Sequence, residues 1–236
     1  MQIAGSTALV TGANRGIGRH FAEQLVARGA KKVYATARRP ETVDLPGVEV
    51  LRLDITDPDS VAAAARAAQD VDLLVNNAGI STYTNLVDGD LHAVHREMDT
   101  HFYGTLHVVR AFAPVLAANG GGAILNVLSA LSWFSYDGTN AYAAAKAAEW
   151  SLTNGVRIEL APRGTLVTGL HLGAADTDIA ASYTGEKADP ADIARAGLDG
   201  VAAGAFEVVA DEWSAHVKAS LAAAPERFYA DALTAS

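Results

Sequence analysis

The sequence predicts an α/β fold with a doubly wound parallel sheet in a single domain, and three observations lead to this prediction. The chain has 236 residues, of which 50% are hydrophobic and 19% charged, a balance that supports one sizeable core. Short runs rich in β-branched residues alternate with longer alanine-rich stretches, the pattern of βαβ units. No internal repeat and no linker rich in Pro, Ser or Gly divides the chain, so we expect residues 1–236 to form one domain.

Seven apolar runs are predicted to be strands, and a helical pattern precedes or follows each of them. Two of the helices start with an aspartate followed by proline, at Asp57-Pro58 and Asp189-Pro190, which is a good N-terminal signal. Residues 174–189 lack periodicity, so we expect a lid there, extending to about residue 200. The expected strands are residues 7–11, 32–37, 48–52, 73–76, 122–127, 164–170 and 206–210, and the expected helices are residues 16–28, 60–69, 88–116 with a break near Gly104, 142–160, 190–203 and 212–224.

Composition excludes several classes of function. The formal charge is −9, from 27 acidic and 18 basic residues, and no run of Lys or Arg exceeds two, so we expect no nucleic-acid partner. The absence of cysteine excludes disulfides, thiolate catalysis and cysteine-ligated metals. No run of about 18 apolar residues and no basic leader is present, so we expect no membrane span and a cytoplasmic protein.

A glycine-rich loop lies between the first predicted strand and the first predicted helix, in the letters TGANRGIG of residues 11–18. Glycines at this place allow a tight turn and a close approach of the backbone to a pyrophosphate, and the free amides of the helix N-terminus then face the anion. The same letters are also compatible with an ordinary strand-to-helix turn. The residues expected to contact a dinucleotide are Gly12, Asn14, Arg15, Gly16, Ile17 and Gly18.

The end of the second predicted strand indicates which dinucleotide is bound. An NAD-binding site is expected to have Asp or Glu here, against the ribose 2′-hydroxyl, whereas this chain has Ala37, Arg38 and Arg39. Guanidinium groups suit a 2′-phosphate, and Arg15 can reach the same group, so NADP(H) is the expected cofactor. The alternative is that Arg38 and Arg39 are solvated bases beyond a strand.

Two further strand ends add candidate cofactor contacts. Asp54 and Ile55 follow the third strand, where a carboxylate is expected near the adenine. The fourth strand ends in Asn-Asn-Ala-Gly, at the edge of a parallel sheet where ligands bind, although paired asparagines can also cap a turn. The contacts expected from this second group are Asn76, Ala78 and Gly79.

Four motifs together resemble the short-chain dehydrogenase/reductase family: the glycine loop, the Asn-Asn-Ala-Gly sequence, Ser129, and the Tyr-x-x-x-Lys sequence of Tyr142 and Lys146. They occur in the family's order and span essentially the whole chain. The resemblance implies a Rossmann-like fold, carbonyl reduction or alcohol oxidation with a nicotinamide cofactor, and a homodimer or homotetramer built partly from the helices at residues 88–116 and 142–160. It also implies that Lys146 holds the nicotinamide ribose.

The chemistry of the same residues agrees with that activity. Tyr142 and Lys146 are four positions apart and lie on one face of a helix. A nearby ammonium favours the phenolate and lowers a tyrosine pKa, so Tyr142 is the expected acid/base. Ser129 is expected to donate a hydrogen bond to the carbonyl oxygen, and Ser132 and Ser135 fit the family spacing less well.

The sequence departs from the family pattern at two places. Where the family has Asn in an Asn-x-x-Gly motif, this chain has His101, which could keep the family's proton relay, could be a packed helix residue, or could have been introduced deliberately. Where the family has Pro-Gly, this chain has Leu172 and Gly173, and Gly173 is expected near the nicotinamide. Thr177 matches a family threonine that contacts the cofactor, and it also suits a helix N-cap.

Aromatic residues near the predicted crevice suggest the substrate. Their positions favour apolar or aromatic substrates, although they could equally be core residues. We find no metal-ligand motif among His92, His95, His107, His171 and His216, so no metal is expected. The expected pocket residues are Tyr83, Trp133, Phe134 and Tyr136.

The sequence therefore predicts an NADPH-dependent oxidoreductase that acts on a small ketone or aldehyde, or on the alcohol in the reverse reaction. A catalytically weak NADP-binding sensor or assembly protein of the same fold is the alternative from another class. Epimerisation or dehydration on the same scaffold is a second alternative, which the intact serine, tyrosine and lysine disfavour.

Overall fold

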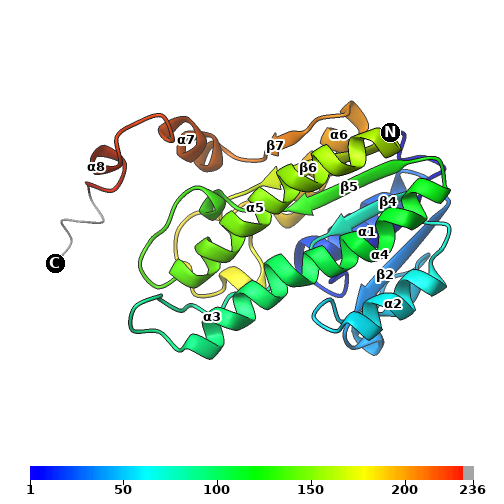
Figure 1. Ribbon diagram of the computed structural model, residues 1–236, viewed down its shortest axis with the longest axis horizontal. Helices are drawn as coiled ribbons and strands as arrows, with labels where there is room; N and C mark the ends of the chain where they lie inside the picture. The colour runs from blue at the N-terminus through cyan, green and yellow to red at the C-terminus, as the bar shows by residue number, and fades with distance from the viewer. Residues whose placement is uncertain (231–236) are drawn as a thin grey trace.

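The computed structural model describes residues 1–230 and contains one seven-stranded parallel sheet (Figure 1). The strand order is β3-β2-β1-β4-β5-β6-β7, so the chain winds outward from β1 in one direction and from β4 in the other. This confirms the predicted doubly wound sheet, with the change of direction between β1 and β4. The strands are β1 Thr7–Val10, β2 Lys32–Ala37, β3 Glu49–Arg52, β4 Leu73–Asn76, β5 Gly122–Val127, β6 Thr165–His171 and β7 Glu207–Val209.

Helices cover both faces of the sheet (Figure 1). Helices α1 and α6 pack on one face through residues such as Phe21 and Ile193, and α2, α4 and α5 pack on the other through residues such as Phe112 and Leu152. The helices are α1 Gly16–Ala27, α2 Pro58–Ala67, α3 Leu91–Met98, α4 Thr105–Ala118, α5 Asn140–Leu160, α6 Pro190–Ala203, α7 Glu212–Ser220 and α8 Pro225–Phe228.

The alternation of side chains along β1 shows why the central strands are uniformly apolar. Ala8 and Val10 join the core under α1 and α6, whereas Leu9 joins the core under α2, α4 and α5. All three side chains are fully buried. A strand with helices on both faces has no solvent-facing side, and its sequence is therefore a continuous hydrophobic run.

The expected long helix at residues 88–116 is three segments. Helix α3 passes into a π-helical segment, η2 at Asp99–Gly104, and then into α4. The side chain of Ile55 packs so closely on Gly104 that a Cβ there would be 2.9 Å from its Cδ1 atom. The predicted break near Gly104 is thus confirmed, and its form is a π-helical segment that places one extra residue in the turn.

The largest differences from prediction are at the C-terminal end. The helix expected at residues 212–224 ends at Ser220, and the short helix α8 follows after a turn. In this part of the described chain, Phe228 and Tyr229 pack against Phe134 near the sheet edge. The last six residues of the expected domain, 231–236, lie outside the described part.

Candidate active site

A cleft of about 1020 Å³ opens at the carboxyl ends of the strands. Its walls come from the loops after β1, β2, β3, β4, β5 and β6 and from the segment at residues 174–188. It spans the point between β1 and β4 where the sheet changes direction, which is the place where open α/β sheets bind ligands. Its volume is at the upper end of the range for small-molecule and cofactor sites.

The glycine loop forms a cradle at one end of the cleft. Gly12 and Gly16 have positive φ angles of 66° and 54°, a conformation in which L side chains are strained. A Cβ on Gly18 would be 2.2 Å from the Gly12 carbonyl oxygen, so only glycine allows helix α1 to start so close to β1. The residue before the helix, Arg15, makes no side-chain cap, and the first-turn amides are therefore free to bind an anion.

Of the six expected contacts in this loop, five line the cleft: Gly12, Asn14, Arg15, Gly16 and Ile17. Gly18 is buried beneath it and makes the cradle possible without facing the ligand. A Cβ at Gly12 would be 3.0 Å from the Cα of Ala78, so glycine keeps the space between the loop and Ala78 open. A dinucleotide phosphate fits this open space.

Charged residues surround the same end of the cleft. Arg38 and Arg39 are exposed at its rim, directly after β2. Arg15 also lines the cleft, and its Nη1 is 2.6 Å from the Oδ2 of Asp178 on the opposite side. Asp54 lines the cleft with Ile55, and its Oδ1 accepts hydrogen bonds from the amide and hydroxyl of Thr56. Three guanidinium groups therefore border one region of the cleft.

The expectation for Asn76 is corrected by the structure. Its side chain is buried in β4 and donates to the Oδ1 of Asn126 at 2.8 Å, away from the cleft. The next residue, Asn77, lines the cleft instead, and its Nδ2 donates to the carbonyl oxygen of Thr11 at 3.0 Å. Successive side chains of a strand point to opposite faces, so a one-residue difference decides which asparagine faces the ligand. Ala78 and Gly79 line the cleft as expected.

Ser129 lies two residues after the end of β5 and is the one of the three candidate serines that lines the cleft. It begins a short 3₁₀ helix, where its Oγ accepts from the amide of Leu131 at 3.1 Å. Ser132 is used in the reciprocal cap, because its Oγ accepts from the Ser129 amide at 3.4 Å. The structure therefore distinguishes Ser129 from its competitors Ser132 and Ser135, neither of which lines the cleft.

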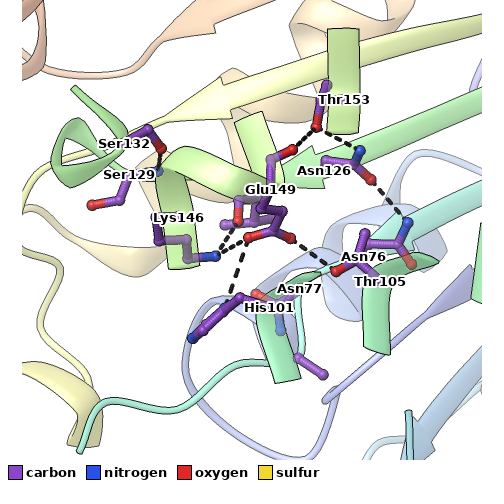
Figure 2. A network of polar contacts seen from close by, with 12 residues as sticks. Asn76, Asn77, His101, Thr105, Asn126, Ser129, Ser132, Lys146, Glu149 and Thr153 are labelled. Carbon is purple, nitrogen blue, oxygen red and sulfur yellow. Dashed lines mark hydrogen bonds and ion pairs between the residues drawn. The ribbon is translucent and has the colours of Figure 1, made fainter. Parts of the chain in front are cut away.

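Tyr142 and Lys146 lie one turn apart on helix α5, and both line the cleft. The Lys146 Nζ is 5.8 Å from the centre of the Tyr142 ring. Lys146 is buried and donates to the carbonyl oxygen of Val127 at 2.8 Å and to the Oε2 of Glu149 at 2.7 Å, as Figure 2 shows for the second of these contacts. The expected serine, tyrosine and lysine thus converge on one region of the cleft.

The pKa of Tyr142 differs in direction from the sequence-based expectation. Burial raises the pKa of the phenol above its usual range, and the Lys146 ammonium and a hydrogen bond with Ser129 only partly oppose this rise. The Glu149 carboxylate adds to the rise. In this arrangement Tyr142 is held as a phenol, the form that donates a proton.

His101 lies in the π-helical segment η2, with its ring edge-on to that of Tyr142 at a centroid distance of 5.1 Å. It is buried, and its Nε2 is 2.9 Å from the carbonyl oxygen of Ile80. Its ring nitrogens lie 3.3 Å from Glu97 and 3.7 Å from Glu149. His101 therefore both packs in the helix and touches the tyrosine, and its part in a proton relay remains a prediction.

Three of the four expected pocket aromatics line the cleft, namely Tyr83, Phe134 and Tyr136. Trp133 does not, because it is a buried core residue that stacks on His171 at a centroid distance of 3.8 Å. Two aromatic residues not predicted from the sequence, Tyr183 and Trp213, also line the cleft. They come from segments without a motif, so no local signal distinguished them.

Residues of the segment 174–188, after β6, line the cleft where the lid is expected, whereas residues 190–200 of the expected lid belong to helix α6. That this lid segment opens and closes stays a prediction. Gly173 and Thr177 both line the cleft, and the Gly173 amide donates to Asp211 at 2.6 Å. Thr177 stands at the N-cap position of a 3₁₀ turn, but its hydroxyl makes no cap and donates weakly to the Ala175 carbonyl oxygen at 3.4 Å. A hydrogen bond from the Tyr83 hydroxyl to Ile179 joins the lid to the far rim.

The part of the chain that the structure describes contains no candidate metal centre and no candidate transmembrane helix. Within residues 1–230, no three His, Cys, Asp or Glu side chains are grouped so that they could hold a metal ion. No helix in the same part of the chain is both long enough and apolar enough to cross a bilayer.

Comparison with known proteins identifies the family. The model of the short chain dehydrogenases matches residues 6–188. The chain belongs to the short-chain dehydrogenase family. The family transfers hydride between a nicotinamide cofactor and a small molecule, and this protein is accordingly an oxidoreductase.

Individual short-chain dehydrogenases resemble this one over most of its length. A crystal structure of a short-chain dehydrogenase from Burkholderia cenocepacia in complex with NADP has 38% identity and a TM-score of 0.95, and covers 99% of this chain and 100% of that one. An uncharacterised oxidoreductase of Staphylococcus saprophyticus is 30% identical, covering 84% of this chain and 92% of that protein. The NADPH-dependent 1-acyldihydroxyacetone phosphate reductase of Schizosaccharomyces pombe is 35% identical, covering 78% of this chain and 64% of that protein.

Proposed function

We propose that this short-chain dehydrogenase reduces a ketone or aldehyde with NADPH, or oxidises the corresponding alcohol in the reverse direction. The observation that carries the proposal is the convergence of Ser129, Tyr142 and Lys146 in one cleft, next to the glycine cradle. Two of the relatives support the choice of cofactor, because one is described as NADPH-dependent and another was crystallised with NADP.

In this proposal Ser129, Tyr142 and Lys146 have different tasks. A bound nicotinamide supplies the hydride. The phenol of Tyr142 donates its proton to the carbonyl oxygen, and the Ser129 hydroxyl donates a hydrogen bond to the same oxygen. Lys146, fixed through its bonds to Val127 and Glu149, holds the ribose and places positive charge beside the phenol as the phenolate forms.

The cofactor end of the cleft supports NADP(H). Arg38, Arg39 and Arg15 border it, and β2 is followed directly by the two arginines, with no carboxylate in the place of a 2′-phosphate. Gly12, Asn14, Gly16 and Ile17 are proposed to hold the pyrophosphate. The further proposed contacts are Asp54, Ile55, Ala78, Gly79, Gly173 and Thr177.

The aromatic residues of the cleft support an apolar or aromatic substrate. Tyr83, Phe134 and Tyr136 line the cleft, and Tyr183 and Trp213 line it as well. Rings of this kind provide large apolar contacts while their polar tips can orient a polar group.

The proposed assembly is a homodimer or homotetramer through helices α4 and α5. The two helices lie side by side on one face of the sheet (Figure 1). Ile158 on α5 is 76% exposed in the single chain, which supports a contact there.

The test is the loss of nicotinamide absorbance with NADPH across a panel of aromatic and aliphatic ketones and aldehydes, with NADH in parallel. We expect turnover, and we expect Tyr142→Phe to reduce kcat by about 10²-fold or more without weakening NADPH binding, because it removes only the acidic proton. Tyr103→Phe is the matched control, since Tyr103 is 48% exposed and lies outside the cleft. Tight NADPH binding without turnover on any substrate would instead support the alternative function, a catalytically weak NADP-binding sensor or assembly protein.

A further inference from the structure

Four buried titratable side chains lie directly behind Tyr142. Lys146 and Glu149 come from α5, His101 from η2 and Glu97 from α3, and none is more than 5% exposed. Figure 2 shows Lys146, Glu149 and His101 pointing toward one another from these elements. Charged groups are rarely buried without a partner, so their arrangement requires a physical explanation.

Glu149 is the centre of this group. Its Oε2 is 2.7 Å from the Nζ of Lys146, and its Oε1 accepts from the Thr105 hydroxyl at 2.9 Å. Its backbone carbonyl oxygen accepts from Thr153, whose hydroxyl in turn accepts from Asn126 (Figure 2). The carboxylate is therefore fixed by Lys146 and Thr105, while Thr153 contacts the backbone of the same residue.

The second carboxylate adds to the negative charge. Glu97 is fully buried and accepts from the Thr82 amide at 2.5 Å, while its Oε2 lies 3.3 Å from His101. Burial opposes ionisation of Glu97, but the contacts with His101 and Thr82 outweigh this and lower its pKa below the usual range. The group thus contains two buried carboxylates, of which Glu149 contacts Lys146 and Glu97 contacts His101.

Resting on the proposed function, we propose that Glu149 is a positioning residue that neutralises Lys146 and so keeps Tyr142 protonated, in the form that donates a proton to a carbonyl oxygen. A free ammonium beside a phenol favours the phenolate, the form that accepts a proton from an alcohol. An ammonium already paired with a carboxylate at 2.7 Å favours it much less.

The surroundings of Tyr142 support this direction. Burial and the charges of Glu149 and Glu97 raise the pKa of the phenol, whereas Lys146 and Ser129 lower it. Glu149 also raises the pKa of Lys146, although burial alone lowers it, so the ammonium is retained. On β6, His171 adds no positive charge at neutral pH, because burial lowers its pKa to about 4. His101 and the carboxylates account for the remaining charged or titratable neighbours on α3, η2 and α5.

The first experiment does not depend on turnover. Tyrosinate absorbance is titrated for the wild-type protein and for Glu149→Gln, and the signal of Tyr142 is isolated by subtracting the same titration with Tyr142→Phe in each background. We expect Glu149→Gln to lower the midpoint of Tyr142 by about one pH unit, because the lysine then acts on the phenol without a carboxylate partner. Equal midpoints would overturn the proposal.

Glu159→Gln is the matched control, because Glu159 lies on the same helix and is exposed to solvent. It should leave the midpoint of Tyr142 unchanged. If Glu149→Gln does not fold, Glu149→Met replaces it, since Met has a similar length and no charge, and the same criterion applies.

The second experiment uses the active enzyme. In Glu149→Gln, the alkaline limb of the kcat/KM profile for reduction and the acidic limb of the profile for oxidation should both move to lower pH by the same amount. The KM for NADPH should stay within about twofold, because Lys146 keeps its bond to Val127. A uniform loss of kcat at every pH would indicate a structural role only. Absence of any turnover would contradict the proposed function, while the absorbance titration would still decide the role of Glu149.

Discussion

His171 shows how a single buried residue makes the stability of the protein depend on pH. Its ring is 1% exposed and stacks on Trp133, and its Nδ1 is 3.1 Å from the carbonyl oxygen of Ser129. Burial lowers the pKa of the imidazole from 6.5 to about 4, although the hydrogen bond to Ser129 partly opposes this and Glu207 lies 3.9 Å away. The folded protein therefore holds His171 neutral at a pH where the unfolded chain protonates it.

The sign of the pH effect follows from that difference. Above about pH 6.5 the residue is neutral in both states and its contribution to stability is complete. As the pH falls from 6.5 toward 4, only the unfolded state binds the proton, so the free energy of unfolding decreases. We expect a loss of about 2 kcal/mol between pH 7.5 and pH 5, measured by urea unfolding, that is absent in His171→Gln. His216→Gln, at an exposed position of α7, should behave as the wild type. The same pH dependence in His171→Gln would exclude this origin.

The loop between β1 and α1 is the element on which cofactor binding depends most. A Cβ at Gly18 would be 2.2 Å from the Gly12 carbonyl oxygen and 2.4 Å from the Asn77 Nδ2, so Gly18→Ala must displace the loop. We expect a loss of about 1–3 kcal/mol in stability and at least a tenfold weaker affinity for NADPH. Thermal unfolding and a fluorescence titration with NADPH measure the two effects.

Gly155→Ala is the control for this change, because it also lies in a helix but has nothing within 4 Å of the added Cβ. Alanine is a better helix former than glycine, so this variant should be as stable as the wild type or up to about 1 kcal/mol more stable, with unchanged NADPH binding. Equal losses in both variants would show that crowding at Gly18 is not the cause.

The elements also show what the sequence could predict. All seven strands and most helices were predicted, because each carries a local periodic pattern or a cap, as at Asp189-Pro190. The side chains that face the cleft were predicted less well, since Asn76 and Trp133 point into the interior while their neighbours Asn77 and Phe134 line the cleft. Tertiary packing decides which of two neighbouring residues at a strand end faces the cleft, and the local sequence carries no signal of that choice.

The roles of residues that contact partners distant in the sequence could not be predicted, for a related reason. Glu149 lies three positions after Lys146, and from its charge we expect it on the surface of the helix. It is instead buried against Thr105. The contact of Arg15 with Asp178 joins residues 163 positions apart. Such pairs form only when the whole sheet is assembled, so neither periodicity nor a motif marks them.

At the scale of the whole molecule, the cofactor end of the cleft is closed by a contact between the first loop and the lid. Arg15 and Asp178 form an ion pair at 2.6 Å, and both side chains are largely exposed. Asp178 is therefore paired with the guanidinium group of Arg15, the group that we propose binds the 2′-phosphate of NADPH. A surface ion pair of this kind is weak, so a phosphate dianion can replace the carboxylate.

This competition predicts opposite effects of two substitutions on cofactor choice. Asp178→Asn should strengthen NADPH binding about two- to fivefold and leave NADH nearly unchanged, because only the phosphate gains the released Arg15. Arg38→Asp should weaken NADPH at least tenfold relative to NADH, since a carboxylate then faces the phosphate. Calorimetric titration of both cofactors measures the four affinities. Asp192→Asn, which removes an exposed carboxylate paired with Arg195 on α6, is the control and should change neither. If Asp178→Asn strengthens both cofactors equally, the ion pair acts by holding the lid across the cleft, and the 2′-phosphate is bound by Arg38 and Arg39 without Arg15.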